Sequence, residues 1–363
     1  MKLQVTQENL AKALGVVARV ANARQTLPIL ANVLLKTVDN RLSVAATNLD
    51  IAMTQFIGAK IDKDGAITVP ARLLQDLVAS LPKGNLSLEL NDNKLHLNTD
   101  KYQSVINGLP AEDFPVMPAI AGSAKWSMPA GELKAGLAQV VFAASADDAR
   151  PILTAVYFHS DARSLSIAAT DSYRLAEKKL PGVKNVNSLL VPATAIQDLL
   201  RVITEADQAV EVTHDDQQAS FQTGNITLVT RLIEGNYPDY AKLIPKTFAT
   251  TAKLRRDEFI NITKVSSLFA RESAGSITIK VNEDDKQISI KSIASQLGEN
   301  TAEADAEARG NGEVTLNSRY LLEGLQAFDG PAVEFCFNGK LEPCVLRAPG
   351  GSDYTHIIMP LRS

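Results

Sequence analysis

The feature that most constrains this chain is an internal repeat with a period close to 123 residues. Thr47-Asn48 returns as Thr170-Asp171, an offset of 123 residues (47 to 170). Val69–Ala71 returns as Val191–Ala193 at nearly the same spacing. Self-similarity at a fixed period indicates a repeated structural unit. A chain of 363 residues also exceeds the usual size of one hydrophobic core, so we expect several copies of one domain.

The third copy is fainter but keeps the same spacing. Asp92, Asp215 and Asn338 each lie in a turn signal between two alternating apolar runs, and each is 123 residues from the next (92, 215 and 338). Leu316–Glu323 occupies the place where Val191–Ala193 begins a helix in the second copy. The repeat therefore predicts three domains.

Two proline-bearing connectors, residues 114–123 and 243–247, precede the second and third copies, where linkers between domains belong. The predicted domains are 1–122, 123–246 and 247–363.

Each copy has the pattern of an α+β domain. Leu10, Leu14 and Val17 follow the helical period near the start of the first copy, and a second helical pattern follows later in every copy. Runs such as Ser276–Val281 and Val333–Phe337 alternate apolar and polar residues, as half-buried antiparallel strands do. The predicted fold class is α+β with three repeated domains and antiparallel sheets.

Charge and composition exclude several classes of protein. A net charge of -4 argues against a protein that coats nucleic acid with bulk positive charge, so any DNA contact is local. The first residues lack the apolar core of a signal peptide and no window is long enough to cross a membrane, so we expect a cytoplasmic protein without membrane contact. Cys336 and Cys344 lack zinc-site or disulfide spacing and are predicted to be buried free thiols.

No common catalytic or nucleotide-binding motif occurs, so we expect neither an enzyme nor a bound cofactor or metal. Asp147-Asp148 and Glu283–Asp285 are interpreted as solvated turns, although paired carboxylates can coordinate Mg²⁺. Two alternatives stay open on the residues alone: a repeat-domain scaffold that binds proteins only, and a metal-dependent enzyme with a site between its domains.

Five segments carry a resemblance to a known family. They are Arg24–Leu30, Arg150–Thr154, Ala169–Leu175, Glu234–Tyr240 and Ile357–Arg362. In this order and spacing the chain resembles the bacterial DNA polymerase III beta subunit, the replicative sliding clamp, along its full length. The resemblance implies the DNA clamp fold, in which two chains close head to tail into a ring with sheets outside and helices lining the bore. It implies a processivity factor that encircles duplex DNA without sequence preference.

The resemblance also implies partners and sites. The partners are replicative and other DNA polymerases, the clamp loader and repair proteins, which bind through short linear motifs in a cleft. The cleft residues carried over from the family are Leu153, Thr170, Ser172, Tyr173, Arg174, Leu175, Pro238, Leu243, Ile357, Met359, Pro360 and Leu361. On pattern alone Leu153, Leu175 and Ile357 are core residues. Ser363 replaces the apolar terminal residue of some relatives.

DNA contact is assigned to cations. Arg24 matches a DNA-contacting position of the family, and Asp147-Asp148 stands where some relatives have an uncharged contact residue. Lys12 and Lys264 lie opposite apolar helix stripes. The candidate bore cations are Arg24, Lys12, Arg72, Lys134, Arg201 and Lys264.

The homodimer interface is predicted from an apolar pair. Leu268 and Phe269 precede a charged pair, which is typical of a buried centre with a polar rim. We expect them to pack against the strand near Val105 and Ile106 of the second chain.

Overall fold

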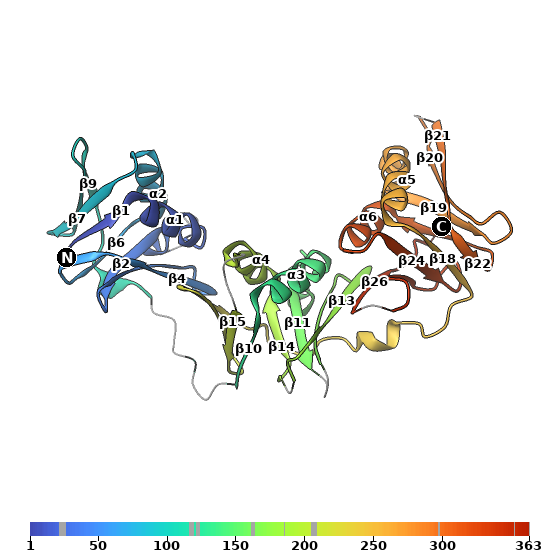
Figure 1. Ribbon diagram of the computed structural model, residues 1–363, viewed down its shortest axis with the longest axis horizontal. Coiled ribbons are helices and arrows are strands. Elements are labelled where there is room, and N and C mark those ends of the chain that lie inside the picture. The colour runs from blue at the N-terminus through green and yellow to red at the C-terminus, as the bar shows by residue number, and fades with distance from the viewer. Residues whose placement is uncertain are drawn as a thin grey trace. The chain divides into compact units, whose positions relative to one another are not determined.

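The computed structural model consists of two compact units, described separately below (Figure 1). The described residues are 1–21, 27–115, 120, 124–160, 164–184, 186–204, 209–296, 298–351 and 353–362. Unit 1 comprises Met1–Gly131 and Gln197–Leu232, and unit 2 comprises Glu132–Ile196 and Ile233–Ser363. The middle third of the sequence therefore contributes to both units.

Unit 1 contains a five-stranded sheet, ordered β5-β1-β7-β8-β9, and an eight-stranded sheet, ordered β10-β15-β16-β17-β4-β3-β2-β6. The strands are β1 (Lys2–Thr6), β2 (Asn32–Val38), β3 (Arg41–Thr47), β4 (Ile51–Gly58), β5 (Lys60–Lys63), β6 (Ala66–Pro70), β7 (Asn85–Asn91), β8 (Lys94–Asn98), β9 (Gln103–Asn107), β10 (Ala124–Pro129), β15 (Ala209–His214), β16 (Gln218–Thr223) and β17 (Ile226–Arg231). All the pairings in these two sheets are antiparallel.

Two helices pack side by side in unit 1, α1 (Gln7–Val17) and α2 (Ala71–Ser80). The Thr6 hydroxyl caps α1 by accepting a hydrogen bond from the amide of Asn9 at 3.4 Å. The helical spacing of Leu10, Leu14 and Val17 puts all three side chains on the buried face. The repeated segment Val191–Ala193 also leads into a helix, α4 (Ala193–Val202), which begins in the sequence of unit 2 and ends in that of unit 1.

Unit 2 contains a nine-stranded sheet, ordered β14-β11-β12-β13-β26-β25-β24-β18-β22, and a four-stranded sheet, ordered β21-β20-β19-β23. The strands are β11 (Ala155–Ser160), β12 (Ser164–Thr170), β13 (Arg174–Pro181), β14 (Leu189–Pro192), β18 (Thr250–Arg255), β19 (Ser276–Asn282), β20 (Gln287–Ala294), β21 (Gly298–Asp305), β22 (Glu307–Arg309), β23 (Gly312–Asn317), β24 (Ala332–Phe337), β25 (Cys344–Arg347) and β26 (Tyr354–Ile358). The helices are α3 (Ala130–Val140), α5 (Arg256–Phe269) and α6 (Ser318–Gln326).

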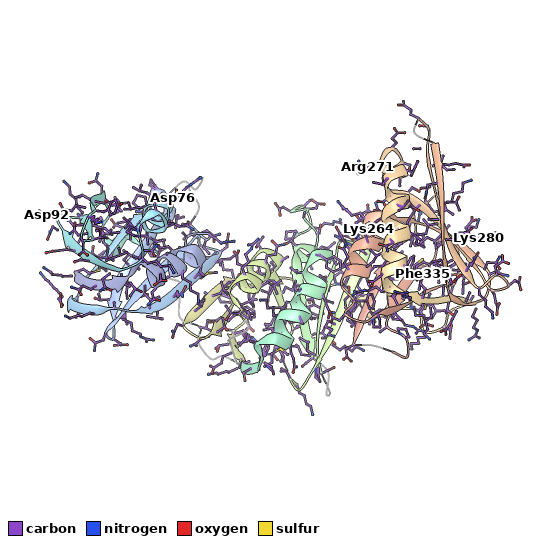
Figure 2. All side chains as sticks on the ribbon, turned by 45° about the horizontal axis from the view of Figure 1, so that its top comes forward. Asp76, Asp92, Lys264, Arg271, Lys280 and Phe335 are labelled. Atoms are coloured by element: carbon purple, nitrogen blue, oxygen red, sulfur yellow. The ribbon has the colours of Figure 1, made fainter. Side chains whose placement is uncertain are left out.

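The core of unit 2 forms where α5 meets β24. The ring of Phe259 lies 5.8 Å from that of Phe335, which lies 5.4 Å from that of Phe337, and all three are fully buried. Figure 2 shows Phe335 within this unit. These close ring contacts hold α5 against the sheet. Helix α6 lies beside α5.

Strand pairing crosses the boundaries between the sequence repeats. In unit 1, β4 pairs with β17, and in unit 2, β13 pairs with β26. Leu175 of the second third thereby faces Ile357 of the last third. Pairing of this kind uses up sheet edges that would otherwise attract other chains.

The structure confirms the α+β class and the two helices in each third. Helix α1 ends at Val17, the last apolar position of the predicted pattern, and α3 ends at Val140. Cys336 and Cys344 are free and buried, as predicted, and burial raises the pKa of the Cys336 thiol to about 12. Among the described residues, no helix combines the length and apolar character that a membrane crossing requires.

Candidate functional site

The turn between β12 and β13 is held by its own side chains. The Thr170 hydroxyl donates to the carbonyl of Arg174 at 2.6 Å and accepts from the amide of Ser172 at 3.1 Å. The Asp171 carboxylate accepts from the amides of Tyr173 at 2.9 Å and Arg174 at 3.0 Å. Ser172 has a positive φ of 79°. This tight turn leaves Tyr173 60% exposed.

The Arg174 side chain lies beneath this turn, with only 8% of its surface exposed. Its Nε donates to Asp171 at 3.0 Å, one terminal nitrogen donates to the carbonyl of Phe142 at 2.6 Å, and the other pairs with Glu323 of α6. The Tyr320 ring covers it at 4.6 Å. All three nitrogens of Arg174 therefore have partners within the chain, and its expected role as a peptide contact stays a prediction.

The floor beside the turn is apolar. Leu175 and Ile357, paired across β13 and β26, are each 2% exposed and pack in one cluster with buried Tyr240 and Cys336. The segment after Leu232 packs against the same cluster through Tyr237, Ile244 and Phe248. The expectation from pattern that Leu175 and Ile357 are core residues holds, and they support the surface from below.

The segment after Ile233 is anchored through Tyr240. The Tyr240 hydroxyl donates to Glu177 at 2.7 Å and lies 2.7 Å from Nε2 of His159. Burial, and then the neighbouring Glu177 charge, raises the pKa of Tyr240. The phenol therefore stays protonated and holds the turn η5 (Tyr240–Leu243), whose last residue is 51% exposed.

The C-terminal residues complete the surface. The amide of Met359 donates to the carbonyl of Tyr173 at 2.8 Å, and the amide of Leu361 donates to the carbonyl of Thr315 at 2.9 Å. Met359, Pro360 and Leu361 remain half-buried. We call the combination of Thr170–Leu175, Tyr240–Leu243 and Ile357–Leu361 the docking surface.

Of the expected cleft residues, Leu175 and Ile357 belong to the apolar cluster and the others lie outside it. Leu153 is buried in the short helix η4 (Pro151–Thr154), whereas Pro238 is exposed just before η5, and Leu243 is exposed at its end. Ser172 is exposed in the turn, and Ser363 lies outside the described residues.

Sequence reasoning missed Tyr237, Tyr240, Tyr320 and Glu323 as members of the site. The first two fall in the matched segment Glu234–Tyr240, which was the available signal. Tyr320 and Glu323 lie in α6 and reach the turn only through tertiary packing.

The candidate DNA-contacting cations lie on different helices. Lys12 on α1 and Arg72 on α2 are exposed in unit 1. Lys264, labelled in Figure 2, is exposed on α5 in unit 2. Lys134 is half-buried on α3, and Arg201, exposed on α4, pairs with Asp198 at 2.7 Å. Arg24 lies outside the described residues.

The predicted dimer contacts divide into surface and core. Leu268 is 50% exposed and Phe269 is half-buried at the end of α5, and Val105 is 56% exposed on β9, an edge strand. Ile106 is 4% exposed and pairs with Leu95 inside its own unit, so its side chain lies away from the exposed face of β9. Successive residues of a strand point to opposite faces, so Val105 and Ile106 do not share one surface.

The acidic groups behave as turn residues. Asp147 accepts from the amide of Ala149 at 3.0 Å, and Glu283 accepts from the amide of Gly310 at 2.8 Å. In the part of the chain that the structure describes, no three His, Cys, Asp or Glu residues gather as metal ligands would.

The structure thus consists of repeated α+β domains whose antiparallel sheets continue from one third of the sequence into the next. Family models of the DNA polymerase III beta subunit match its N-terminal domain at residues 1–118, its central domain at 127–239 and its C-terminal domain at 241–362. This chain belongs to the DNA polymerase III beta subunit family.

Individual relatives agree with the family assignment. The beta sliding clamp of Synechocystis is 31% identical over 388 residues, covering 100% of this chain and 99% of that protein. The DNA polymerase sliding clamp from Bacillus subtilis superposes with a TM-score of 0.96 at 26% identity, covering 100% of this chain and 99% of the other. The Caulobacter crescentus clamp gives a TM-score of 0.93 at 30% identity with complete coverage of both chains.

Proposed function

We propose that this chain is a replicative sliding clamp, which encircles duplex DNA and holds the replicative polymerase on its template. The observation that carries this function is the match of three clamp domains along the whole chain. Clamps of this family are non-catalytic processivity factors, so neither the metal-dependent enzyme nor the scaffold that binds only proteins is favoured. The work on DNA takes place in the bacterial cytoplasm.

The ring forms from two chains placed head to tail. A heterologous interface closes into a ring when its rotation is completed by a whole number of subunits. A closed ring is retained on DNA by topology, so its contacts with phosphates can be weak, independent of sequence and able to slide. The proposed domain boundaries remain 1–122, 123–246 and 247–363, and the three matched segments support this division.

For the interface we retain Leu268 and Phe269 of one chain against the Val105 face of the other. The apolar exposure of Leu268 and Val105 supports this placement. Replacing Leu268 and Phe269 with aspartate should yield monomers in sedimentation experiments, because two charges would enter an apolar contact. A variant that sediments as an unchanged dimer would refute the placement.

The proposed phosphate contacts are Arg24, Lys12, Arg72, Lys134, Arg201 and Lys264. Exposure of Lys12, Arg72 and Lys264 supports their inclusion. Removing one of them, for example by Lys12→Gln, should reduce the slope of log affinity against log salt by about one or less.

Polymerases, the clamp loader and repair proteins dock through short peptides at the docking surface. Exposed Tyr173 and Leu243 offer apolar area beside a buried floor, and burying such side chains contributes about 25 cal/mol per Å². Affinity should be moderate, because an unstructured peptide loses entropy on binding.

Deleting residues 359–363 tests this docking role. The deletion removes the Met359 amide that bonds to Tyr173 and the apolar tail beside it. Peptides from the polymerase should lose binding in fluorescence anisotropy, while sedimentation still shows a dimer. Equal peptide affinities for the deletion and the wild type would place the partner site elsewhere.

A further inference from the structure

Glu323 lies on α6, outside every segment that suggested the docking surface from sequence. Its side chain is 34% exposed and forms an ion pair with buried Arg174. A second cation, Arg319, approaches it from the next turn of the same helix at 3.9 Å and is 69% exposed. Glu323 therefore joins α6 to the turn between β12 and β13.

The other hydrogen-bond partners of the Arg174 side chain are closer to it in sequence than Glu323 is. Asp171 belongs to the same turn, and Phe142 lies in the short helix η3 (Val141–Ala143) after α3. Within the described part of the chain, Glu323 is the one charged partner of Arg174 from outside its turn. Losing the Glu323 charge would leave the guanidinium tied to α6 only by a weaker hydrogen bond to a neutral acceptor and by the Tyr320 ring.

The position of Arg174 determines the position of the exposed groups. Its carbonyl accepts from Thr170 at 2.6 Å, which closes the turn that carries Tyr173. The Tyr173 carbonyl accepts from the Met359 amide at 2.8 Å. A displacement of Arg174 therefore moves both sides of the docking surface, although Glu323 itself is no part of that surface.

We propose that Glu323 is a positioning residue for partner binding. Its carboxylate holds Arg174, and Arg174 holds Tyr173 and Met359 in the arrangement that a peptide recognises. The affinity of the docking surface is then coupled to the placement of α6. This inference rests on the proposed function of the surface as the site of partner peptides.

The test measures peptide affinity by fluorescence anisotropy. The probe is the fluorescein-labelled peptide that binds wild type most tightly among short overlapping peptides spanning the catalytic polymerase subunit of the same organism. Glu323→Gln should weaken binding by about tenfold, because it replaces a charge-assisted hydrogen bond to Arg174 with a weaker one to a neutral acceptor. The double variant Arg174→Met with Glu323→Gln should bind no more weakly than Arg174→Met alone, because both changes remove one interaction.

Two control variants separate positioning from general stability. Arg319→Gln removes the exposed partner of Glu323 and should change affinity by less than about twofold. Gln139→Leu removes the bonds from α3 to the carbonyl of Ala327 at 2.8 Å and to Asp329 at 3.1 Å. It should lower Tm at least as much as Glu323→Gln, yet leave peptide affinity unchanged.

The outcomes distinguish the two proposals. The positioning role would be overturned if Glu323→Gln bound the peptide as tightly as wild type. It would also be overturned if Glu323→Gln and Gln139→Leu both lost peptide affinity in proportion to their loss of Tm. Failure of every polymerase peptide to bind wild type would instead overturn the proposed docking function, and the positioning role with it.

Discussion

Thr47 and Thr170 occupy equivalent places in two copies of the repeat and make the same hydrogen bonds. The Thr47 hydroxyl donates to the carbonyl of Ile51 at 3.0 Å, and the Thr170 hydroxyl donates to the carbonyl of Arg174 at 2.6 Å. In each turn the residue that follows the threonine, Asn48 or Asp171, accepts two backbone amides through its side chain.

The backbone of the two turns also agrees. The third residue has a φ of 78° at Leu49 and 79° at Ser172. A residue other than glycine adopts this left-handed conformation at a cost, so its presence in both copies shows that the turn itself is part of the repeated domain.

The side chains that follow differ completely. The first turn continues with Asp50 and buried Ile51, whereas the second continues with exposed Tyr173 and buried Arg174. The comparison teaches that the turn belongs to the repeated fold, and that the two copies differ in the side chains that follow it, which in the second copy lie in the proposed docking surface.

The largest expected difference in stability concerns the buried residue four positions after each threonine, which is Ile51 in the first turn and Arg174 in the second. Arg174→Met should lower the free energy of unfolding by about 3 kcal/mol, near the lower end for a broken buried ion pair, because Glu323 is still exposed enough to be hydrated. Ile51→Met preserves apolar volume and should cost less than about 1.5 kcal/mol. Urea unfolding of both variants measures these two losses of stability. Equal losses for Arg174→Met and Ile51→Met would contradict the prediction.

The threonines should behave alike in stability and differently in binding. Thr47→Val and Thr170→Val each leave a turn carbonyl and amide without the hydroxyl, and each should cost about 1–3 kcal/mol in unfolding. Peptide affinity measured by anisotropy should fall for Thr170→Val alone. If Thr47→Val weakened peptide binding equally, the two turns would not differ in function.

The surroundings of Arg174 should also make unit 2 sensitive to acid. His356 is fully buried, its ring lies 5.6 Å from that of Phe142, and burial followed by the Arg174 charge lowers its pKa from 6.5 to about 3. The unfolded chain binds this proton near pH 6.5 and the folded chain does not. Stability is therefore complete above pH 6.5 and falls by up to about 1.4 kcal/mol per pH unit below it.

The variant His356→Gln isolates this contribution. His214 in unit 1 also has a pKa lowered by burial, so the wild type combines both effects. Urea unfolding at several values of pH between about 7.5 and about 4.5, a range that brackets the ordinary histidine pKa, should show a flatter profile of stability against pH for His356→Gln. Parallel profiles for variant and wild type would mean that His356 takes up its proton in the folded state.

Local elements of the fold could be predicted because their signals are local. The spacing of Leu10, Leu14 and Val17 predicted the buried face of α1, and the alternation in Val333–Phe337 predicted β24. The joining of β13 to β26 could not be predicted from either strand, because antiparallel pairing between distant segments leaves no pattern in a single sequence.

The site divides in the same way. Tyr173 and Arg174 were both expected at the peptide cleft, and the structure leaves Tyr173 exposed and buries Arg174 beneath it. Its partner Glu323 is 149 residues away in sequence, so only the tertiary structure brings the pair together. The alternation of side chains along a strand was enough to predict that Val105 and Ile106 lie on opposite faces of β9.

The most direct test of the sliding clamp uses topology. The chain is placed on circular plasmid DNA by the clamp loader of the same organism, the plasmid is cut once by a restriction enzyme, and the bound protein is measured by gel filtration before and after the cut. A ring that encircles DNA should stay on the closed circle at high salt and be lost after the cut, because it slides off the free ends. Equal retention on circular and linear DNA would contradict the account.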